Sequence, residues 1–392
     1  MKFNFDEPVN RKNTNSIKHD AMETFMGAKD AIPMWVADMD FKSPPCIVNA
    51  LKKRLEHEVF GYTIKPQEFF DSIINWMQKR HQWEIKKEWI SFCPGVVAGF
   101  TLAIQQLTQS GDKIIVQPPV YFPFFDSVNN TDRELIYNPL KLINGRLNFD
   151  FDDLLSKIDA NVKMLLLCNP HNPGGSVWTK DELLKLSQIC EKHHIIVVSD
   201  EIHADVVFSP AIHTPYASVS EYAAQNSLTV MSHSKTFNVA GLTTSFVIAA
   251  NKELLLKYNK GLNTPHLHMG NIFGTIALIA AYTHGEEWLT QLIQYLKTNI
   301  NLVNEFCKTN MPKMKVIVPE STYLIWIDCR EFGMTRSELS EFFLHKAKVA
   351  VNIGGMFGIE GESFVRMNIG CPKSTVEKAL KQIKSAYLSN KL

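Results

Sequence analysis

Lys235 is the residue of this sequence that most clearly carries chemistry. It follows Ser232 and Ser234, so an amine stands beside two hydroxyl groups in a short polar segment. Asp200 and Asn172 lie in two earlier polar segments, and a run of apolar residues precedes each segment. An amine can bond covalently to a carbonyl group, and a carboxylate can hold a nearby positive charge. Each residue also has a plain structural explanation, because Asp200 could cap a helix and Lys235 could be a solvated charge in a turn.

Two further segments add a phosphate site and an aromatic ring. Gly95 opens a predicted helix, and its turn presents the backbone N–H groups of Gly95, Val96 and Val97. Free N–H groups at the positive end of a helix dipole suit a phosphate. The turn matches neither G-x-G-x-x-G nor the P-loop, and an ordinary strand-to-helix turn is the commoner explanation of such a segment. Tyr121 follows another apolar run and offers a ring for stacking, although it could also belong to the core.

Together these groups match one cofactor, pyridoxal 5′-phosphate (PLP). PLP has a phosphate, an aromatic ring, a ring oxygen, a basic ring nitrogen and an aldehyde. Lys235 would form a Schiff base with the aldehyde. Asp200 would keep the ring nitrogen protonated, so that the ring withdraws electrons from the substrate.

An alternation of apolar and amphipathic segments between about residues 90 and 250 must position these groups. Amphipathic patterns at 97–107 and 180–193 predict helices. Strands that are apolar on both faces and alternate with helices predict a mostly parallel sheet with helices on both faces. Ligands bind beyond the carboxyl ends of such strands, where the candidate residues lie. The predicted strands are 89–92, 113–117, 163–168, 195–199, 228–231 and 245–250.

The rest of the chain predicts an arm and a second domain. Apolar residues spaced by three or four between Trp288 and Phe306 predict one long helix. After it, strands at 315–318, 322–327 and 363–369 and helices at 337–346 and 375–388 predict a smaller α+β domain. We therefore expect an α/β protein with an N-terminal arm at 1–45, which contributes to the small domain and the active site. A large cofactor-binding domain at 46–285 and a long helix with the small C-terminal domain at 286–392 complete it.

Composition and charge exclude several classes of protein. The chain has 392 residues, of which 45% are hydrophobic and 21% charged, as in a globular protein. Lys and Arg number 41 against 40 Asp and Glu, so no overall charge attracts nucleic acid or an anionic membrane. The nearly apolar run 272–282 is shorter than the roughly 20 residues of a membrane span, and acids interrupt the first residues too early for a signal peptide. We expect a cytoplasmic protein without nucleic-acid or membrane partners.

Cysteines and histidines predict neither disulfides nor a metal site. The 7 cysteines are scattered and contain no C-x-x-C pair, so we expect buried structural thiols. The 13 histidines show no zinc-binding spacing.

The motifs as a set resemble the fold-type-I PLP enzymes of the class I/II aminotransferase superfamily. The resemblance covers nearly the whole chain. It implies a PLP-dependent transferase-like fold in which a late arginine binds the substrate carboxylate. The motifs are N-P-x-N-P-G-G at 169–175, D-E-I-H at 200–203, S-x-S-K at 232–235 and F-V-R-M-N-I-G at 364–370.

Within this superfamily the sequence most resembles one branch, the MalY/PatB-like cystathionine β-lyases, or C–S lyases. Two departures from ordinary aminotransferases support this branch: His203 stands where many have Tyr, and Thr243 stands where many have Arg. The segments that resemble the branch are 33–41, 59–62, 177–179 and 321–324.

The resemblance implies a role for each site residue. Lys235 would bond to the cofactor and act as the base at Cα, Asp200 would pair with the ring nitrogen, and Tyr121 would stack on the ring. Asn172 would reach the ring oxygen and the substrate. The phosphate contacts would come from Gly95, Val96, Val97, Ser232 and Ser234.

Further roles concern the substrate and a second subunit. Arg366 would bind the substrate carboxylate in bidentate fashion, with the backbone of Val36 and Ala37 closing over it. Tyr62 would reach the phosphate of the neighbouring subunit, so the active sites of a homodimer would be shared. The roles of two residues stay open. Trp35 could line the substrate pocket or anchor the arm, and His203 could face the cofactor or contribute only to packing.

We therefore expect β-elimination from an amino-acid substrate, cystathionine or another cysteine S-conjugate, giving a thiol, pyruvate and ammonia. Cystathionine would give homocysteine as the thiol. A class I/II aminotransferase is the first alternative, because transamination shares the early steps. A PLP-binding regulatory protein with little catalysis is the second. The sequence does not indicate which S-conjugate is the natural substrate.

Overall fold

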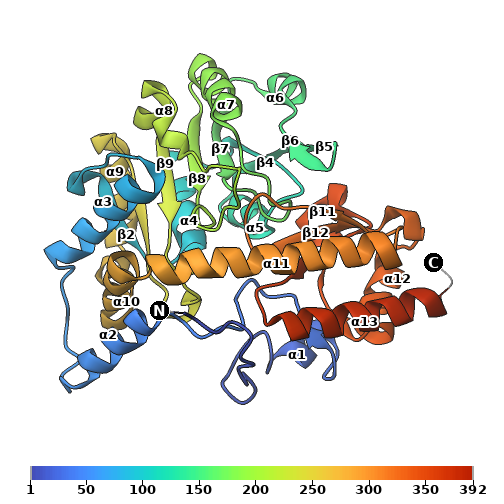
Figure 1. Ribbon diagram of the computed structural model, residues 1–392. Coiled ribbons are helices and arrows are strands. Elements are labelled where there is room, and N and C mark those ends of the chain that lie inside the picture. The colour runs from blue at the N-terminus through green and yellow to red at the C-terminus, as the bar shows by residue number, and fades with distance from the viewer. Residues whose placement is uncertain (1, 391–392) are drawn as a thin grey trace.

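A seven-stranded sheet forms the centre of the larger domain in the computed structural model, which describes residues 2–390 (Figure 1). Every neighbouring pair is parallel except those of β10, which runs antiparallel to β2 and β9. The predicted mostly parallel sheet is therefore confirmed. Its strands, in spatial order, are β2 (Ile90–Cys93), β10 (Ser245–Ile248), β9 (Ser227–Met231), β8 (Ile196–Asp200), β7 (Val162–Cys168), β3 (Lys113–Val116) and β4 (Glu134–Tyr137).

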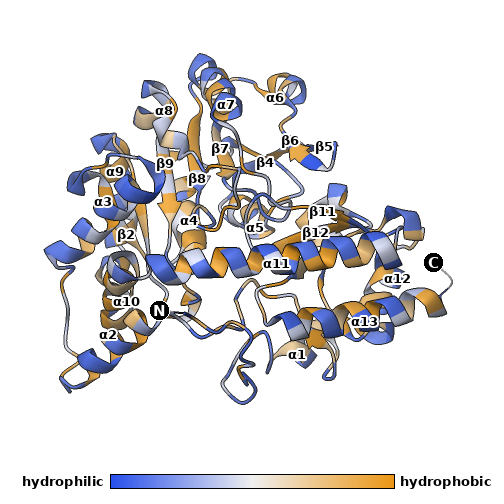
Figure 2. Ribbon diagram, viewed as in Figure 1, coloured by the Kyte–Doolittle hydropathy of each residue, from blue (hydrophilic) through white to orange (hydrophobic). Residues whose placement is uncertain are grey.

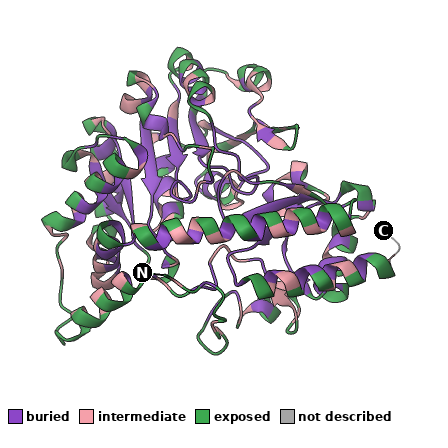
Figure 3. Cartoon of the chain, viewed as in Figure 1, coloured by how far each residue is buried: buried purple, intermediate pink, exposed green. Residues whose placement is uncertain are grey.

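Helices cover both faces of this sheet, and for that reason the central strands are apolar on both faces. Within β7, Met164 and Leu166 pack into one hydrophobic cluster while Leu165 and Leu167 pack into another. Figure 3 shows the sheet buried between the helical layers. One cluster includes residues of α4 (Val96–Leu107), α5 (Pro123–Asn129) and α9 (Lys252–Asn263), and the other includes residues of α6 (Phe151–Lys157), α7 (Lys180–His193) and α8 (Glu221–Gln225).

The start of α7 follows from its sequence. Thr179 accepts a hydrogen bond from the backbone N–H of Glu182, and the Glu182 side chain accepts one from the backbone N–H of Thr179. This reciprocal cap satisfies N–H groups that the first turn leaves free. The other elements of the larger domain are α2 (Pro45–Leu55), α3 (Gln67–His81), α10 (Ile272–His284), β5 (Lys141–Ile143) and β6 (Arg146–Asn148).

The long helix α11 (Glu286–Asn310) leads from the larger domain into the smaller one (Figure 1). Its apolar stripe is buried, and its outer face is hydrophilic (Figure 2). The smaller domain holds an antiparallel sheet of β11 (Lys315–Ile317), β12 (Leu324–Asp328), β15 (Phe364–Asn368) and β14 (Asn352–Ile353), with α12 (Arg336–Glu341) and α13 (Lys373–Ser389).

The N-terminal arm joins the smaller domain. After α1 (Met22–Met26), β1 (Ile32–Pro33) pairs in parallel with β13 (Val349–Ala350). The exact division of the chain at residues 45 and 285 stays a prediction. Within residues 2–390 no helix combines the length and apolar character needed to cross a membrane.

Candidate active site

The predicted cofactor residues meet at the carboxyl ends of the parallel strands. Asp200 ends β8, Asn172 lies in the loop after β7, and Lys235 lies in the loop after β9. These residues line one cavity of about 170 Å³, which we call the inner cavity. The other predicted residues on its wall are Gly95, Val96, Val97, Tyr121, His203, Ser232 and Ser234.

The N-terminus of α4 forms one end of the inner cavity. No side chain caps this helix, whose first residues are Val96 and Val97 after Gly95. Backbone N–H groups and the helix dipole therefore favour an anion at this point. Ser234 lies on the same wall, but the Ser232 hydroxyl donates to the Thr244 carbonyl at 2.9 Å. Ser232 therefore lies at the cavity, and its hydroxyl proton already takes part in a hydrogen bond within the protein.

Asp200 is buried and Lys235 is partly buried, and their pKa values shift for the same reason. Burial raises the pKa of Asp200 to about 7, and the Oδ1 atom accepts a hydrogen bond from the Ile202 N–H at 3.1 Å. Burial lowers the pKa of Lys235, whose Nζ donates to the Ala37 carbonyl at 2.7 Å. A positively charged group beside Asp200 would stabilise its carboxylate, so this position fits a protonated ring nitrogen.

His203 lies on the wall of the inner cavity and is buried. Its Nδ1 has no hydrogen-bond partner among the described residues, and burial lowers its pKa to about 3, so the ring is neutral. A buried polar atom without a partner is costly unless a ligand supplies one. This placement favours the cofactor-facing interpretation of His203 over a role in packing alone.

Arg366, on β15, is a buried cation whose hydrogen-bond partners are all neutral. Its Nη1 donates to Asn172 Oδ1 at 2.9 Å, and its Nη2 donates to Asn352 Oδ1 at 2.7 Å and to the Trp35 carbonyl at 3.2 Å. Its Nε has no partner among the described residues, and burial lowers its pKa to about 10. The side chain therefore stays charged at neutral pH and favours a carboxylate beside it.

A second, larger cavity of about 1060 Å³ adjoins these residues, and we call it the outer cavity. Ala37, Tyr121 and Lys235 line both cavities, so the Lys235 amine stands where the two meet. Arg366 lines the outer cavity. An amino acid bound by its carboxylate to Arg366 therefore has room to extend away from Lys235.

The arm segment 35–39 lies against both domains through its carbonyl groups. The Ala37 carbonyl accepts hydrogen bonds from Lys235 and from the Tyr323 hydroxyl at 3.0 Å. Asn368 Nδ2 donates to the carbonyls of Val36 and Asp38. Trp35, Val36 and Ala37 all line the outer cavity, and Trp35 Nε1 also donates to the Lys18 carbonyl. Trp35 thus lines the cavity and also anchors the arm, the two roles that the sequence left open.

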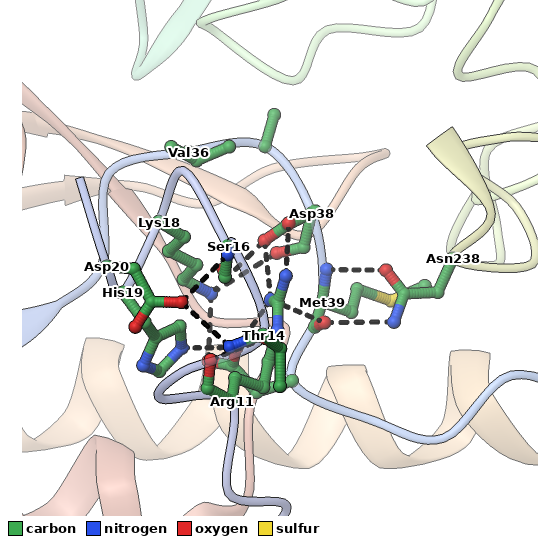
Figure 4. Close-up of polar contacts among 12 residues, drawn as sticks. Arg11, Thr14, Ser16, Lys18, His19, Asp20, Val36, Asp38, Met39 and Asn238 are labelled. Atoms are coloured by element: carbon green, nitrogen blue, oxygen red, sulfur yellow. Dashed lines mark hydrogen bonds and ion pairs between the residues drawn. The ribbon is translucent and has the colours of Figure 1, made fainter. Parts of the chain in front are cut away.

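An ion-pair cluster that the sequence analysis missed holds this arm segment in place (Figure 4). Lys18 is 1% exposed and pairs with Asp40 at 2.8 Å, and Arg11 pairs with Asp38 at 2.7 Å. Burial alone would raise the pKa of Asp40, but Lys18, His19 and Arg11 outweigh it and hold that pKa well below its usual range. Asp38 and Asp40 lie in the segment 33–41, but their partners Arg11 and Lys18 lie outside it, so nothing in the sequence indicated the pairing.

Two residues near Lys235 were also missed. Asn238 accepts a hydrogen bond from the Met39 N–H and donates to the Met39 carbonyl, both at 2.9 Å (Figure 4). The Thr236 hydroxyl donates to buried Asp205 at 2.8 Å. The Lys235 loop is therefore fixed to the arm on one side and to the larger domain on the other.

Tyr62 does not reach either cavity of its own chain. Its side chain is 96% exposed, and it lines a separate surface depression with Phe60. Val59, Phe60 and Ile64 are exposed as well, and we call residues 59–64 the apolar loop. A solvent-exposed cluster of this kind is typical of an interaction surface.

The donor set fits PLP. The structure supplies N–H groups for a phosphate, a buried acid for a ring nitrogen, an amine for an aldehyde and an unpartnered imidazole nitrogen on the same wall. The aromatic ring of Tyr121 lines the cavity between them. Among the described residues no group of three or more His, Cys, Asp or Glu side chains could hold a metal ion.

Comparison with known proteins gives matches along nearly the whole chain. The family model described as aminotransferase class I and II matches residues 29–383. Cystathionine beta-lyase PatB of Bacillus subtilis (strain 168) is 43% identical over 98% of this chain and 100% of its own length. Cystalysin from Treponema denticola, whose crystal structure contains a pyridoxal 5′-phosphate cofactor, has a TM-score of 0.96 and 35% identity over 99% of this chain and 100% of that chain. The PLP-bound C–S lyase from Staphylococcus hominis has a TM-score of 0.92 and 33% identity over 98% of both chains.

Proposed function

Because the chain belongs to the aminotransferase class I and II family and is a PLP-dependent carbon–sulfur β-lyase, we propose that its own cavity residues catalyse β-elimination from cystathionine or another cysteine S-conjugate. The observation that carries this proposal is that Lys235 and Arg366 line the same cavity. One offers an amine with a lowered pKa and the other a buried positive charge without an acidic partner, and both line the outer cavity.

The reaction consumes one S-conjugate and one water and gives one thiol, one pyruvate and one ammonia. The Cα–H bond and the Cβ–S bond break, and the electron pair from Cα–H forms a double bond between Cα and Cβ. The pair from the Cβ–S bond leaves with sulfur, which takes up a proton. The remaining three-carbon product reacts with water to give pyruvate and ammonia.

Binding and orientation of the substrate come from Arg366 of the smaller domain and the two amide side chains that hold it. The Arg366 guanidinium binds the substrate carboxylate, while Asn172 and Asn352 hold its planar group in one orientation. Trp35, Val36 and Ala37 of the arm segment line the same region. A substrate held in one orientation presents its Cα–H bond to a fixed base.

Lys235 acts on the proton at Cα. PLP, when bound, supplies a ring that withdraws electrons from Cα and makes this proton acidic. Asp200 would pair with the positively charged ring nitrogen, because a buried carboxylate favours a cation beside it. The lowered pKa of Lys235 increases the fraction of its amine that is free to accept the proton at neutral pH.

We propose further that two copies of the chain associate through the apolar loop, so that Tyr62 of each reaches the inner cavity of the other. The exposure of Tyr62, Val59, Phe60 and Ile64 supports this arrangement. A cytoplasmic location is proposed as well, supported by 7 cysteines that are all free.

The test of the proposed function supplies the purified enzyme with S-methyl-L-cysteine and no keto acid. We expect methanethiol and pyruvate to appear in equal amounts over many turnovers. If turnover began only after a keto acid was added, the aminotransferase alternative would replace the lyase. If neither condition gave turnover although PLP was bound, the regulatory alternative would replace both.

A further inference from the structure

The outer cavity is larger than the carboxylate and Cα of an amino acid require. Arg366 and Lys235 occupy one part of its wall. Apolar side chains of the arm and the smaller domain form much of the remaining wall, to which Phe122 of the larger domain also contributes. Those of the arm and the smaller domain include Ile17, Phe25, Met26, Leu344, Ile353 and Met356.

Aromatic rings stand at the arm side of this wall. The rings of Phe25 and Trp35 lie 6.0 Å apart and are tilted by 41°. Phe25 is 64% exposed and Ile17 is 58% exposed, although both are large apolar residues. Exposed apolar side chains that line a cavity beside a reactive amine are typical of a binding site for an apolar group.

The charges of the outer cavity all have one sign. Its charged lining residues are Lys235, Arg366 and Arg336, and no carboxylate is among the lining residues. Arg336 lies at the outer part, 4.0 Å from Glu362, which does not line the cavity. The far end of cystathionine carries an ammonium group as well as a carboxylate. That ammonium group would enter a cationic cavity without an acidic partner, and such a burial is unfavourable.

We propose that the outer cavity binds the sulfur substituent of the substrate and selects large, uncharged apolar substituents, aromatic or branched aliphatic, over the amino-acid substituent of cystathionine. This inference rests on the proposed function and narrows it to one class of S-conjugate. The substrate carboxylate lies at Arg366, the sulfur points away from Lys235, and the substituent packs between Phe25 and Met356. The thiol released is then an apolar one.

The first experiment compares three substrates with the PLP-loaded enzyme: S-benzyl-L-cysteine, S-methyl-L-cysteine and L-cystathionine. We expect kcat/KM for S-benzyl-L-cysteine to exceed the other two values by at least about tenfold, because a single methylene in a fitted pocket already changes kcat/KM by about 10-fold or more. A higher kcat/KM for cystathionine would overturn the inference and leave the proposed function intact. Absence of thiol release from all three would overturn the proposed function itself.

A second measurement records binding without turnover. Replacing sulfur by CH₂ gives 2-amino-5-phenylpentanoic acid and 2,7-diaminooctanedioic acid, which cannot eliminate a thiol. Calorimetry should show at least about tenfold tighter binding of the phenyl compound, because burial of apolar area is favourable and burial of an unpaired ammonium is not. Equal affinities would contradict the inference.

The third experiment places a carboxylate in the cavity. In Phe25→Asp we expect kcat/KM for S-benzyl-L-cysteine to fall and that for cystathionine to rise, so that their ratio decreases by about tenfold. The exposure of Phe25 makes the substitution compatible with folding. Leu388→Asp is the matched control, because Leu388 is 61% exposed and lies outside the cavity. An unchanged ratio in Phe25→Asp, or an equal change in Leu388→Asp, would overturn the inference.

Discussion

At the scale of single residues, burial favours the neutral form of each charged group of the site. It lowers the pKa of Arg366 to about 10 and raises the pKa of Asp200 to about 7. Arg366 keeps its charge at neutral pH, whereas burial works against the carboxylate form of Asp200. Arg366 therefore attracts an anion, and Asp200 becomes a carboxylate most readily beside a cation.

The geometry of Arg366 leads to a prediction about Arg366→Lys. An ammonium group cannot make two parallel hydrogen bonds to a carboxylate while it also contacts Asn172 and Asn352. We expect kcat/KM for an S-conjugate to fall by about 10- to 100-fold, the cost of one or two charged hydrogen bonds. Steady-state kinetics of thiol release checks this. Arg330→Lys is the control, because Arg330 is 60% exposed and pairs with Asp328, and a similar loss there would contradict the role of Arg366.

The raised pKa of Asp200 predicts how the stability of the PLP-free chain depends on pH. A carboxyl group whose pKa is higher in the folded state favours folding at low pH, and this contribution is lost as pH rises through about 7. We expect the free energy of unfolding of the wild type to fall relative to that of Asp200→Asn between pH 5 and pH 8. Urea unfolding of both PLP-free chains measures the difference. A difference that does not change with pH would contradict the assigned pKa.

At the scale of elements, most of the strands and helices were predictable because their signals are local. Two examples depend only on residues close together in the sequence. They are the alternation of β7 residues between two hydrophobic clusters and the Thr179 cap of α7. The antiparallel direction of β10 was not, because strand direction depends on the path of the whole chain. Contacts such as Asn238 with Met39 join residues 199 positions apart and leave no local pattern.

The ion-pair cluster of the arm leads to a prediction about Lys18→Met. Its loss leaves Asp40 buried with weaker compensation, and breaking a buried pair in this way costs about 3–5 kcal/mol. We expect the free energy of unfolding to fall by about that amount. Lys29→Met is the control, because Lys29 is 70% exposed in its pair with Glu23, and exposed pairs contribute only about 0–1 kcal/mol. Equal losses in the two variants, measured by urea unfolding, would refute the stabilising role of the buried pair.

At the scale of the whole molecule, Tyr62 is predicted to reach the active site of a neighbouring copy, and it lies on the surface of its own chain. A residue contributed by a second copy cannot be placed from one chain. The apolar loop can take part in an active site only if two copies of the chain associate. Within one chain, by contrast, the sequence predicted part of the lining of the inner cavity, because residues such as Gly95, Asn172 and Lys235 lie in segments that follow a strand.

Mixed dimers test this assembly. Tyr62→Ala and Lys235→Ala chains are each expected to be nearly inactive alone. In a dimer of the two, one site combines an intact Lys235 with the partner's intact Tyr62. After random mixing we expect about one quarter of the wild-type thiol release to return, because half of the dimers are mixed and each has one complete site. If activity did not return although mixed dimers formed, Tyr62 would not act across the interface.

The central claim is that the Lys235 amine moves the proton at Cα in a lyase reaction. The most direct measurement is thiol release from S-benzyl-L-cysteine by PLP-loaded Lys235→Ala, with and without added methylamine. We predict a loss of at least about 100-fold, the contribution of a positioned base, and partial recovery with methylamine. Thiol release within a few-fold of the wild type, without any amine added, would contradict the claim.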